Sequence, residues 1–134
     1  MLVLDTHALI WAHMGARIPK PVARRIEAAG RTNQLFISAI TPWEIALGVR
    51  RGRIKIAGSV LAWIADALEA LSASVASLEP AIAVDAVDLV WDHADPSDRI
   101  IVATARRLDA SLVTADTDIL AFADATRAVR VLEL

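Results

Sequence analysis

Short, continuously apolar segments alternate along this chain with longer segments whose apolar residues recur at helical intervals. The first segment, residues 1–5, is an apolar run that ends in an acid, which is typical of a strand buried on both faces of a parallel sheet. Further strands are predicted at residues 34–38, 74–78, 111–114 and 129–132. Helices are predicted at residues 6–14, 19–29, 41–51, 60–71, 80–91, 96–108 and 118–123. This alternation predicts right-handed βαβ crossovers, and hence one α/β domain over residues 1–134 with a mainly parallel central sheet flanked by helices.

The composition supports one compact domain and excludes several classes of site. The chain has 134 residues, of which 56% are hydrophobic and 22% charged, enough for a substantial core. A net charge of -2 argues against binding polyanions through bulk charge, so contact with nucleic acid requires a local patch or a metal. The absence of cysteine excludes zinc–thiolate sites, disulfides and thiol nucleophiles. Without a signal peptide or a long apolar span, we expect a cytoplasmic protein with no membrane partner.

Acidic residues fall where the predicted fold brings distant segments together. Asp5 and Asp116 follow predicted strands, so in a parallel sheet both lie at the carboxyl edge, where open α/β sheets bind their ligands. Glu44 and Asp98 lie in the first turns of predicted helices, and helices that follow strands begin at the same edge. We therefore expect all four carboxylates to converge in one pocket.

Each acid also has a purely structural explanation. Asp5 and Asp116 fit helix N-caps, Glu44 fits a capping box that begins at Thr41, and Asp98 fits a similar box. Convergence favours a functional interpretation, because carboxylates about 5 Å apart repel by ~3 kcal/mol at an effective dielectric of about 20. A divalent cation offsets this repulsion, and an all-oxygen site suits Mg²⁺ or Mn²⁺. Such a cation activates a bound water and neutralises charge on a phosphodiester.

The main basic cluster follows the predicted helix that carries Glu44. Arg50, Arg51 and Arg53 either form a solvated helix end or bind substrate phosphates beside the acidic pocket. Arg99 follows Asp98 directly, where it orients that carboxylate, contacts substrate or forms a surface ion pair. The sequence leaves these alternatives open.

The histidines and aromatic residues are assigned structural roles. His7 and His13 point away from each other around a helix, and neither they nor His93 are needed as a base in metal-activated hydrolysis. The tryptophans and phenylalanines are predicted to fill the core or an interface, because no aromatic cluster offers a base-stacking platform. The high apolar content predicts a hydrophobic surface for a partner.

Four segments carry a resemblance to a known family: residues 2–8 (LVLDTHA), 38–45 (SAITPWEI), 95–105 (DPSDRIIVATA) and 112–116 (LVTAD). At these residues the sequence resembles the PIN-domain family, most closely the VapC-type toxin ribonucleases of bacterial toxin–antitoxin pairs. The segments extend over nearly the whole chain in the family's order.

The resemblance implies a metal-dependent endoribonuclease that cleaves single-stranded regions of RNA and is held inactive by a cognate antitoxin. Asp5, Glu44, Asp98 and Asp116 fall on the family's catalytic acids, and Asp5, Asp98 and Asp116 are the expected ligands of Mg²⁺ or Mn²⁺. Thr6 and Thr114 match hydroxyl positions near the site. Asp118 competes with Asp116 for the fourth position, and many close relatives have lysine where this chain has Gly48. We also expect a homodimer with an antitoxin segment in a groove.

Other functions are weighed against this interpretation. A phosphatase resembling the haloacid dehalogenases would use Asp5 as nucleophile, but that family expects an aspartate where this chain has His7. A receiver-like domain needs a paired early acid and a late lysine, whereas the only lysines are Lys20 and Lys55. A catalytically inactive PIN-like binding module would not require all four acids.

Overall fold

A computed structural model describes residues 1–134, which form a single sheet with helices on both faces. The sheet has strands β1 (Leu2–Leu4), β2 (Leu35–Ser38), β3 (Ser74–Ala76), β4 (Ser111–Thr114) and β5 (Arg130–Glu133). The helices are α1 (Thr6–Met14), α2 (Lys20–Arg31), α3 (Thr41–Arg50), α4 (Val60–Leu71), α5 (Pro80–Asp88), α6 (Pro96–Arg107) and α7 (Thr117–Thr126). All strand pairs are parallel, in the order β3-β2-β1-β4-β5. The predicted α/β class and parallel sheet are confirmed.

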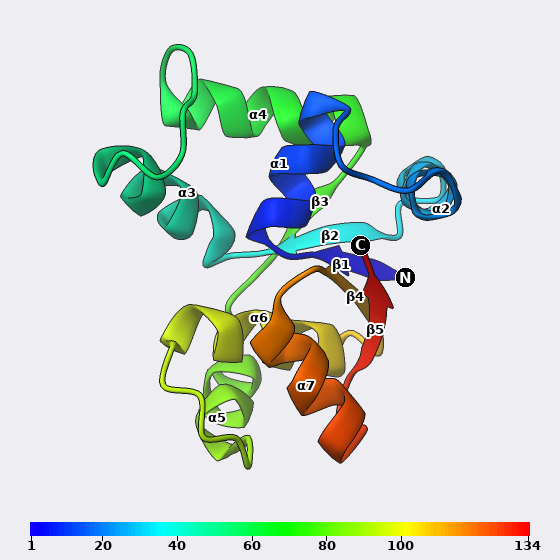
Figure 1. The fold of residues 1–134 in the computed structure, drawn as a ribbon, viewed down its shortest axis with the longest axis vertical. Coiled ribbons are helices and arrows are strands. Elements are labelled where there is room, and N and C mark those ends of the chain that lie inside the picture. The colour runs from blue at the N-terminus through cyan, green and yellow to red at the C-terminus, as the bar shows by residue number, and fades with distance from the viewer.

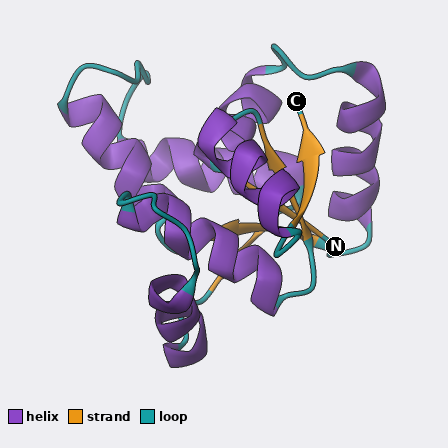
Figure 2. Cartoon of the chain, turned by 60° about the horizontal axis from the view of Figure 1, so that its bottom comes forward, coloured by secondary structure: helices purple, strands orange, loops and turns teal.

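Helices cover the sheet in two groups. Helices α1, α3 and α4 lie above the sheet in Figure 1, and helices α5, α6 and α7 lie below it. Figure 2, seen from another side, shows the strands enclosed between the helices. Helix α2 belongs to the first group, because its apolar residues share a core cluster with α1, α4 and the sheet.

The strand pleat divides the core between these two layers. Leu2 and Leu4 of β1 pack into the cluster beneath α1 to α4, whereas Val3 packs into the cluster with α6 and α7. Adjacent residues of a strand point to opposite faces, so a run of apolar residues feeds both cores. All three residues of β1 are buried, as expected for the central strand of a covered parallel sheet.

The strand order reverses between β1 and β4. The chain proceeds from β1 to β2 and β3 on one side, and then places β4 and β5 on the other side. Open α/β sheets bind ligands in the crevice at such a switch point, beyond the carboxyl ends of the strands. Asp5 follows β1 directly, and Asp116 follows β4 after one intervening residue. The topology therefore places these two acids at the expected crevice.

Two helix ends differ from the prediction for identifiable reasons. Helix α2 continues through Gly30 to Arg31, so Gly30 is not its stop. A Cβ atom at Gly30 would lie 2.4 Å from the carbonyl oxygen of Leu71, so the glycine allows α2 to approach the end of α4. Helix α5 ends at Asp88 rather than near residue 91, and Arg99 donates to the carbonyl groups of Ala86 and Val87, which residues 90 and 91 would need in a longer helix.

Smaller differences affect the remaining elements. Helix α7 is longer than the predicted 118–123, since Asp116 caps it at Thr117 and it runs on to Thr126. Strand β3 ends at Ala76, two residues earlier than predicted, and β5 is shifted by one residue. None of the helices has both the length and the apolar character required to cross a bilayer.

Candidate active site

Asp5 is both a helix cap and a buried acid at the switch point. One carboxylate oxygen, Oδ1, accepts a hydrogen bond from the backbone N–H of Ala8 at 2.7 Å and caps α1. The other oxygen, Oδ2, accepts a hydrogen bond from the hydroxyl of Thr114 on β4. Burial raises the pKa of Asp5, although the hydrogen bonds from Thr114 and Ala8 oppose the shift. The structural and functional interpretations of Asp5 are therefore compatible.

Glu44 lies in the first turn of α3 and turns toward α1. Its Oε1 accepts a hydrogen bond from the hydroxyl of Thr6 at 2.5 Å. The predicted capping box with Thr41 is wrong, because the N-cap is Ile40, which makes no side-chain cap. The Thr41 hydroxyl is instead buried without a hydrogen-bond partner.

The charge state of Glu44 reflects its surroundings. Burial, reinforced by the neighbouring carboxylates Asp98, Asp95 and Asp5, raises its pKa to about 7, while the Thr6 hydrogen bond opposes the shift. A carboxyl group with this pKa exchanges protons near neutral pH, as a general acid or base must. These three carboxylates act on Glu44 because they line the same pocket.

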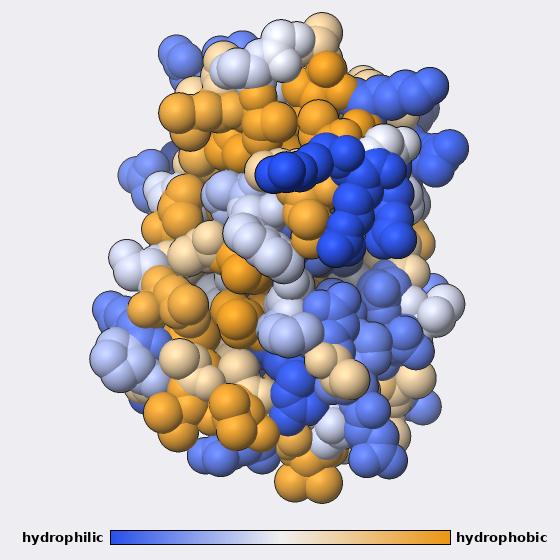
Figure 3. Space-filling view, turned by 90° about the vertical axis from the view of Figure 1, so that its left-hand side faces the viewer, coloured by the Kyte–Doolittle hydropathy of each residue, from blue (hydrophilic) through white to orange (hydrophobic).

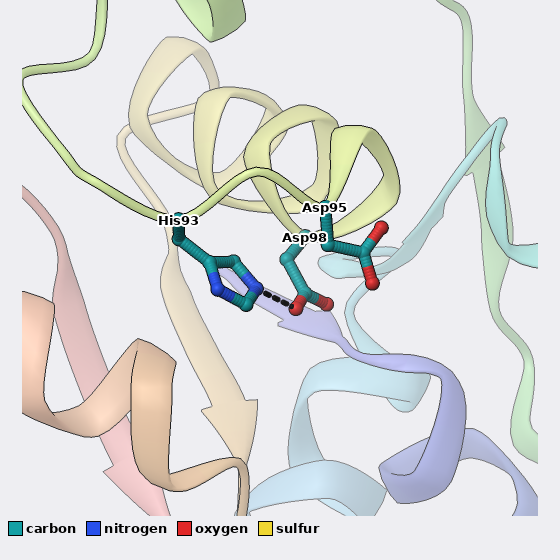
Figure 4. Close-up of side chains that lie close together, drawn as sticks. All are labelled: His93, Asp95 and Asp98. Carbon is teal, nitrogen blue, oxygen red and sulfur yellow. Dashed lines mark hydrogen bonds and ion pairs between the residues drawn. The ribbon is translucent and has the colours of Figure 1, made fainter.

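Asp98 lies in the first turn of α6 and pairs with His93 from the preceding loop. His93 Nε2 is 2.6 Å from Asp98 Oδ2, and Figure 4 shows the imidazole directed at this carboxylate. Asp95 caps α6 by accepting the N–H of Ser97 at 3.0 Å. The Asp98 carboxylate therefore does not complete a capping box with Asp95, which was the purely structural explanation for this acid.

Burial shifts the pKa of Asp98, whereas the neighbouring carboxylates decide the shift of His93. It raises the pKa of Asp98 to about 6, with Asp95 and Asp116 adding to the shift and the His93 hydrogen bond opposing it. For His93, burial disfavours the cation, but the Asp98 hydrogen bond and nearby carboxylates prevail and raise the pKa. His93 is thus part of the acidic site.

The structure adds His93 and Asp95 to the residues that the sequence indicated. One ligand atom from each of His93, Asp95 and Asp98 lies within 4.8 Å of the others, a spacing compatible with a shared cation. The sequence analysis assigned a structural role to His93, because its spacing does not distinguish a loop histidine that points into a pocket from one that faces solvent. Its only local signal is its position just before the Asp95 cap.

Asp116 occupies the fourth corner of the site and caps α7. Its Oδ1 accepts the N–H groups of Asp118 and Ile119 at 2.9 and 3.0 Å. Its own N–H donates to the Thr114 hydroxyl at 3.0 Å, and the same hydroxyl donates to Asp5. Thr114 therefore links the two strand-end acids. The side chain of Asp118 is 66% exposed, and its Oδ2 lies 3.8 Å from Nδ1 of His93. The acidic pocket is lined by Asp116 but not by Asp118.

One pocket collects these groups at the carboxyl edge of the sheet. It has a volume of about 470 Å³ and is lined by Asp5, Thr6, His7, Trp11, Glu44, Asp95, Asp98, Ile101, Ala115, Asp116 and Thr117. The four acids from separate segments thus converge as expected. Carboxyl groups whose pKa is raised by burial and by neighbouring carboxylates fit a hard divalent cation, since its charge favours their ionised forms.

A second groove of about 620 Å³ adjoins the acidic pocket. The two share Thr6, His7, Glu44 and Asp95. Its other lining residues are Ile40, Trp43, Leu47, Gly48, Arg51, Arg53, Ile54, Pro96 and Ser97. The structure therefore brings Arg51 and Arg53 to the site, whereas Arg50 is exposed and outside the lining.

Arg99 makes none of the direct contacts expected from its position beside Asp98. It forms neither an ion pair with Asp98 nor any surface ion pair. At 2.7–3.1 Å, its guanidinium group donates hydrogen bonds to the carbonyl oxygens of Ala86, Val87, Leu89, Trp91 and His93. Arg99 thus holds the loop that carries His93, because its planar donors match several carbonyl groups at once.

Comparison with known proteins gives a consistent result. The PIN domain model matches residues 2–125. Ribonuclease VapC22 of Mycobacterium tuberculosis (strain ATCC 25618 / H37Rv) is 32% identical over 117 residues, which cover 86% of each chain.

Solved structures share the fold at lower sequence identity. VapBC2 from Rickettsia felis, bound to a promoter DNA fragment, superposes with a TM-score of 0.71 at 16% identity, covering 98% of this chain and 97% of that chain. A toxin–antitoxin complex from Klebsiella pneumoniae gives a TM-score of 0.64 at 21% identity, covering 96% and 95%. At these identities, the structures establish similarity of fold.

Proposed function

Because this chain belongs to the PIN-domain family, we propose that it is a metal-dependent endoribonuclease that cleaves single-stranded regions of RNA. The observation that carries the proposal is the convergence of Asp5, Glu44, Asp98 and Asp116 in one pocket. These acids come from four separate segments, and burial raises the pKa of three of them. A stable fold gains nothing by collecting such groups, so we infer that the pocket is functional.

We propose Asp5, Asp98 and Asp116 as the ligands of Mg²⁺ or Mn²⁺. When bound, the cation would supply an activated water and neutralise phosphodiester charge. The chain's own groups hold the site in place: Thr114 fixes Asp5, Thr6 fixes Glu44, and His93 orients Asp98. Glu44 is suited to proton transfer, because its pKa of about 7 lies near neutral pH.

We further propose that a cognate antitoxin and a second copy of the chain bind the protein. The relative found by sequence is a VapC ribonuclease, and the structural neighbours include toxin–antitoxin complexes. Large apolar side chains are exposed on and just after α5: Val84 (60%), Val87 (76%) and Val90 (91%). Apolar surface gathered in this way is suited to a protein partner.

The test is incubation of the purified protein with a single-stranded RNA, in Mg²⁺, in Mn²⁺ and in EDTA. We expect cleavage only with a divalent cation, and a loss of at least about 100-fold in Asp98→Asn, since a metal ligand is removed. Asp124→Asn, which changes an exposed acid on α7, is the matched control and should cleave normally. Asp116→Asn and Asp118→Asn identify the fourth acid, and only the first should lose activity.

Other outcomes identify the alternative functions. RNA binding without cleavage in any metal would indicate a catalytically inactive binding module. Release of phosphate from small esters, with intact RNA, would indicate an aspartate-nucleophile phosphatase. Either result would contradict the ribonuclease proposal.

A further inference from the structure

We propose that single-stranded RNA enters the acidic pocket along the α3 groove, where Trp43 stacks on one base and Arg51 and Arg53 bind the adjoining phosphates. The α3 groove is the groove lined by Trp43, Leu47, Gly48, Arg51, Arg53 and Ile54. This inference rests on the proposed ribonuclease function and names the residues that would position its substrate.

The groove follows one face of α3 and borders the acidic pocket. Its lining residues from Ile40 through Trp43, Leu47 and Arg51 recur every three or four positions, as residues on one side of a helix do. Glu44 lies on the same face and belongs to both the groove and the acidic pocket. An RNA strand lying along this face would therefore reach Glu44, which lines both the groove and the acidic pocket.

Trp43 is the exception among the tryptophans. Trp11, Trp63 and Trp91 pack against the hydrophobic clusters, and each has an aromatic or imidazole neighbour. Trp43 packs into none of these clusters, has no aromatic neighbour and is 55% exposed. An exposed indole in a groove beside a site for phosphodiester chemistry is suited to stacking on a base, which any base can satisfy.

The turn after α3 brings the arginines into the groove wall. Gly52 adopts a positive φ of 71°, and the carbonyl of Gly48 accepts the N–H groups of Arg53 and Ile54 at 2.8 and 3.1 Å. Ile54 packs where Gly48 lacks a side chain, because a Cβ atom there would lie 2.5 Å from Ile54 Cδ1. Gly48 thus allows the turn to fold back closely against the helix.

Both guanidinium groups are available for an anion. Arg51 and Arg53 take part in none of the salt bridges or side-chain hydrogen bonds of the protein. The chain carries a net charge of -2, and the acidic pocket repels phosphates, so a local cationic wall is what attracts the RNA backbone. Figure 3 shows strongly hydrophilic side chains beside hydrophobic surface on the side of the molecule that carries α3.

The contribution of Trp43 is measured by RNA binding in EDTA, where the RNA is not cleaved. We expect Trp43→Ala to raise the Kd for a labelled single-stranded RNA by about 10-fold, and Trp43→Phe by no more than about 2-fold, because phenylalanine still stacks. Leu61→Ala, which changes an exposed apolar residue on α4, should leave the Kd unchanged. Circular dichroism should show that all variants are folded.

An abasic scan of the RNA identifies the stacked base. Removing one base at a time should weaken binding to the wild type most at a single position, and Trp43→Ala should abolish that position's effect. The proposal is overturned if Trp43→Ala binds RNA with unchanged Kd, or if the abasic effect persists in this variant. Unchanged RNA binding together with weaker antitoxin binding would assign the groove to a protein partner and also overturn it.

The salt dependence of binding tests the arginines. Arg51→Ala and Arg53→Ala should each reduce the slope of log K against log salt by about 0.7, the value for one phosphate contact with a single strand. Arg50→Ala is the matched control and should leave the slope unchanged, because Arg50 lies outside the groove. Equal effects of all three substitutions would contradict a specific role for the groove.

Cleavage assays separate this inference from the proposed function. If the wild type binds RNA through Trp43 but cuts none in Mg²⁺ or Mn²⁺, the ribonuclease function fails and the groove assignment stands. If the wild type cuts RNA and Trp43→Ala does so with the same KM, the groove assignment fails and the ribonuclease function stands.

Discussion

Glu44 and Asp98 are held in the folded protein in an environment that disfavours their charged forms. Burial raises the pKa of Glu44 from 4.5 to about 7 and that of Asp98 from 3.8 to about 6. Between the unfolded and folded values, the folded state binds more protons than the unfolded state. The free energy of unfolding therefore falls as the pH rises from about 4 to about 7, and the loss persists above that range.

Replacing Glu44 by glutamine should remove the part of this loss of stability that Glu44 causes, because the amide side chain stays neutral and can still accept the Thr6 hydrogen bond. In EDTA at pH 8, we expect Glu44→Gln to raise the Tm by about 3–6 °C, which corresponds to about 1 kcal/mol in a domain of this size. The gain should disappear near pH 4. Thermal unfolding of Glu44→Gln and of the exposed control Glu69→Gln at both pH values checks this, and an equal gain at pH 4 would contradict it.

Divalent cations should bind with release of protons at pH 6.5. Asp98 and Glu44 are partly protonated at that pH, and carboxyl groups must ionise to bind or adjoin a cation. Titration calorimetry with Mn²⁺ in two buffers of different ionisation enthalpy measures the release, which should vanish at pH 8.5. Asp5→Asn should bind the cation much more weakly than the wild type, whereas Asp118→Asn should bind normally.

At the scale of elements, the loop between α5 and α6 is fixed by a side chain rather than by regular structure. Arg99 binds carbonyl groups along this loop, including that of His93, at 3.1 Å. His93 in turn contacts Asp98. The geometry of one wall of the acidic pocket therefore depends on an arginine that does not line that pocket.

Arg99→Lys should reduce the free energy of unfolding by about 2 kcal/mol or more, because lysine has fewer donors and leaves loop carbonyl groups without partners. Urea denaturation measures the loss. Arg130→Lys is the control: its exposed guanidinium group pairs with the exposed carboxylate of Asp109 at 3.0 Å, so the substitution should cost less than about 1 kcal/mol. Equal losses in the two variants would argue against this role for Arg99.

The packing of α2 on α4 depends on Gly30. A Cβ atom there would lie 2.4 Å from a backbone oxygen of Leu71, which cannot move without displacing α4. We expect Gly30→Ala to reduce the free energy of unfolding by about 1–3 kcal/mol. Helix propensity alone would give the opposite sign. Urea denaturation therefore distinguishes the steric effect from the effect of helix propensity. A stabilised variant would show that the close contact with Leu71 does not prevent a side chain at position 30.

At the scale of the whole molecule, apolar surface is exposed beside the α5–α6 layer. Val84 and Val87 lie on α5 and are 60% and 76% exposed, and Val90 follows the helix with 91% exposure. Their spacing of three residues places Val84 and Val87 on one side of the helix. This surface is suited to the second copy of the chain that we propose as a partner.

Val87→Asp should convert a homodimer to a folded monomer, because an unpaired charge opposes burial of the apolar surface. Light scattering after size exclusion should give the dimer mass for the wild type and the monomer mass for Val87→Asp. Leu61→Asp, on α4, is the control and should stay dimeric. A monomeric wild type over the same concentration range would refute the dimer.

The sequence by itself determined the fold class and the segments that carry the acids. Periodicities of strands and helices are local properties, and a parallel sheet brings the ends of its strands to one edge. The positions of Asp5 and Asp116 after β1 and β4 therefore indicated a common site. The catalytic roles of these residues are still predictions.

Only the tertiary structure decided the partners of the side chains. Thr6 donates a hydrogen bond to Glu44, 38 residues away in the sequence, and Thr114 donates one to Asp5, 109 residues away. The predicted capping box, in contrast, paired Glu44 with a residue only three positions away. The exposure of Trp43 likewise depends on which helices pack around it. Local patterns describe contacts within a turn or a strand, but side chains in a pocket meet through the packing of distant elements, which no single segment encodes.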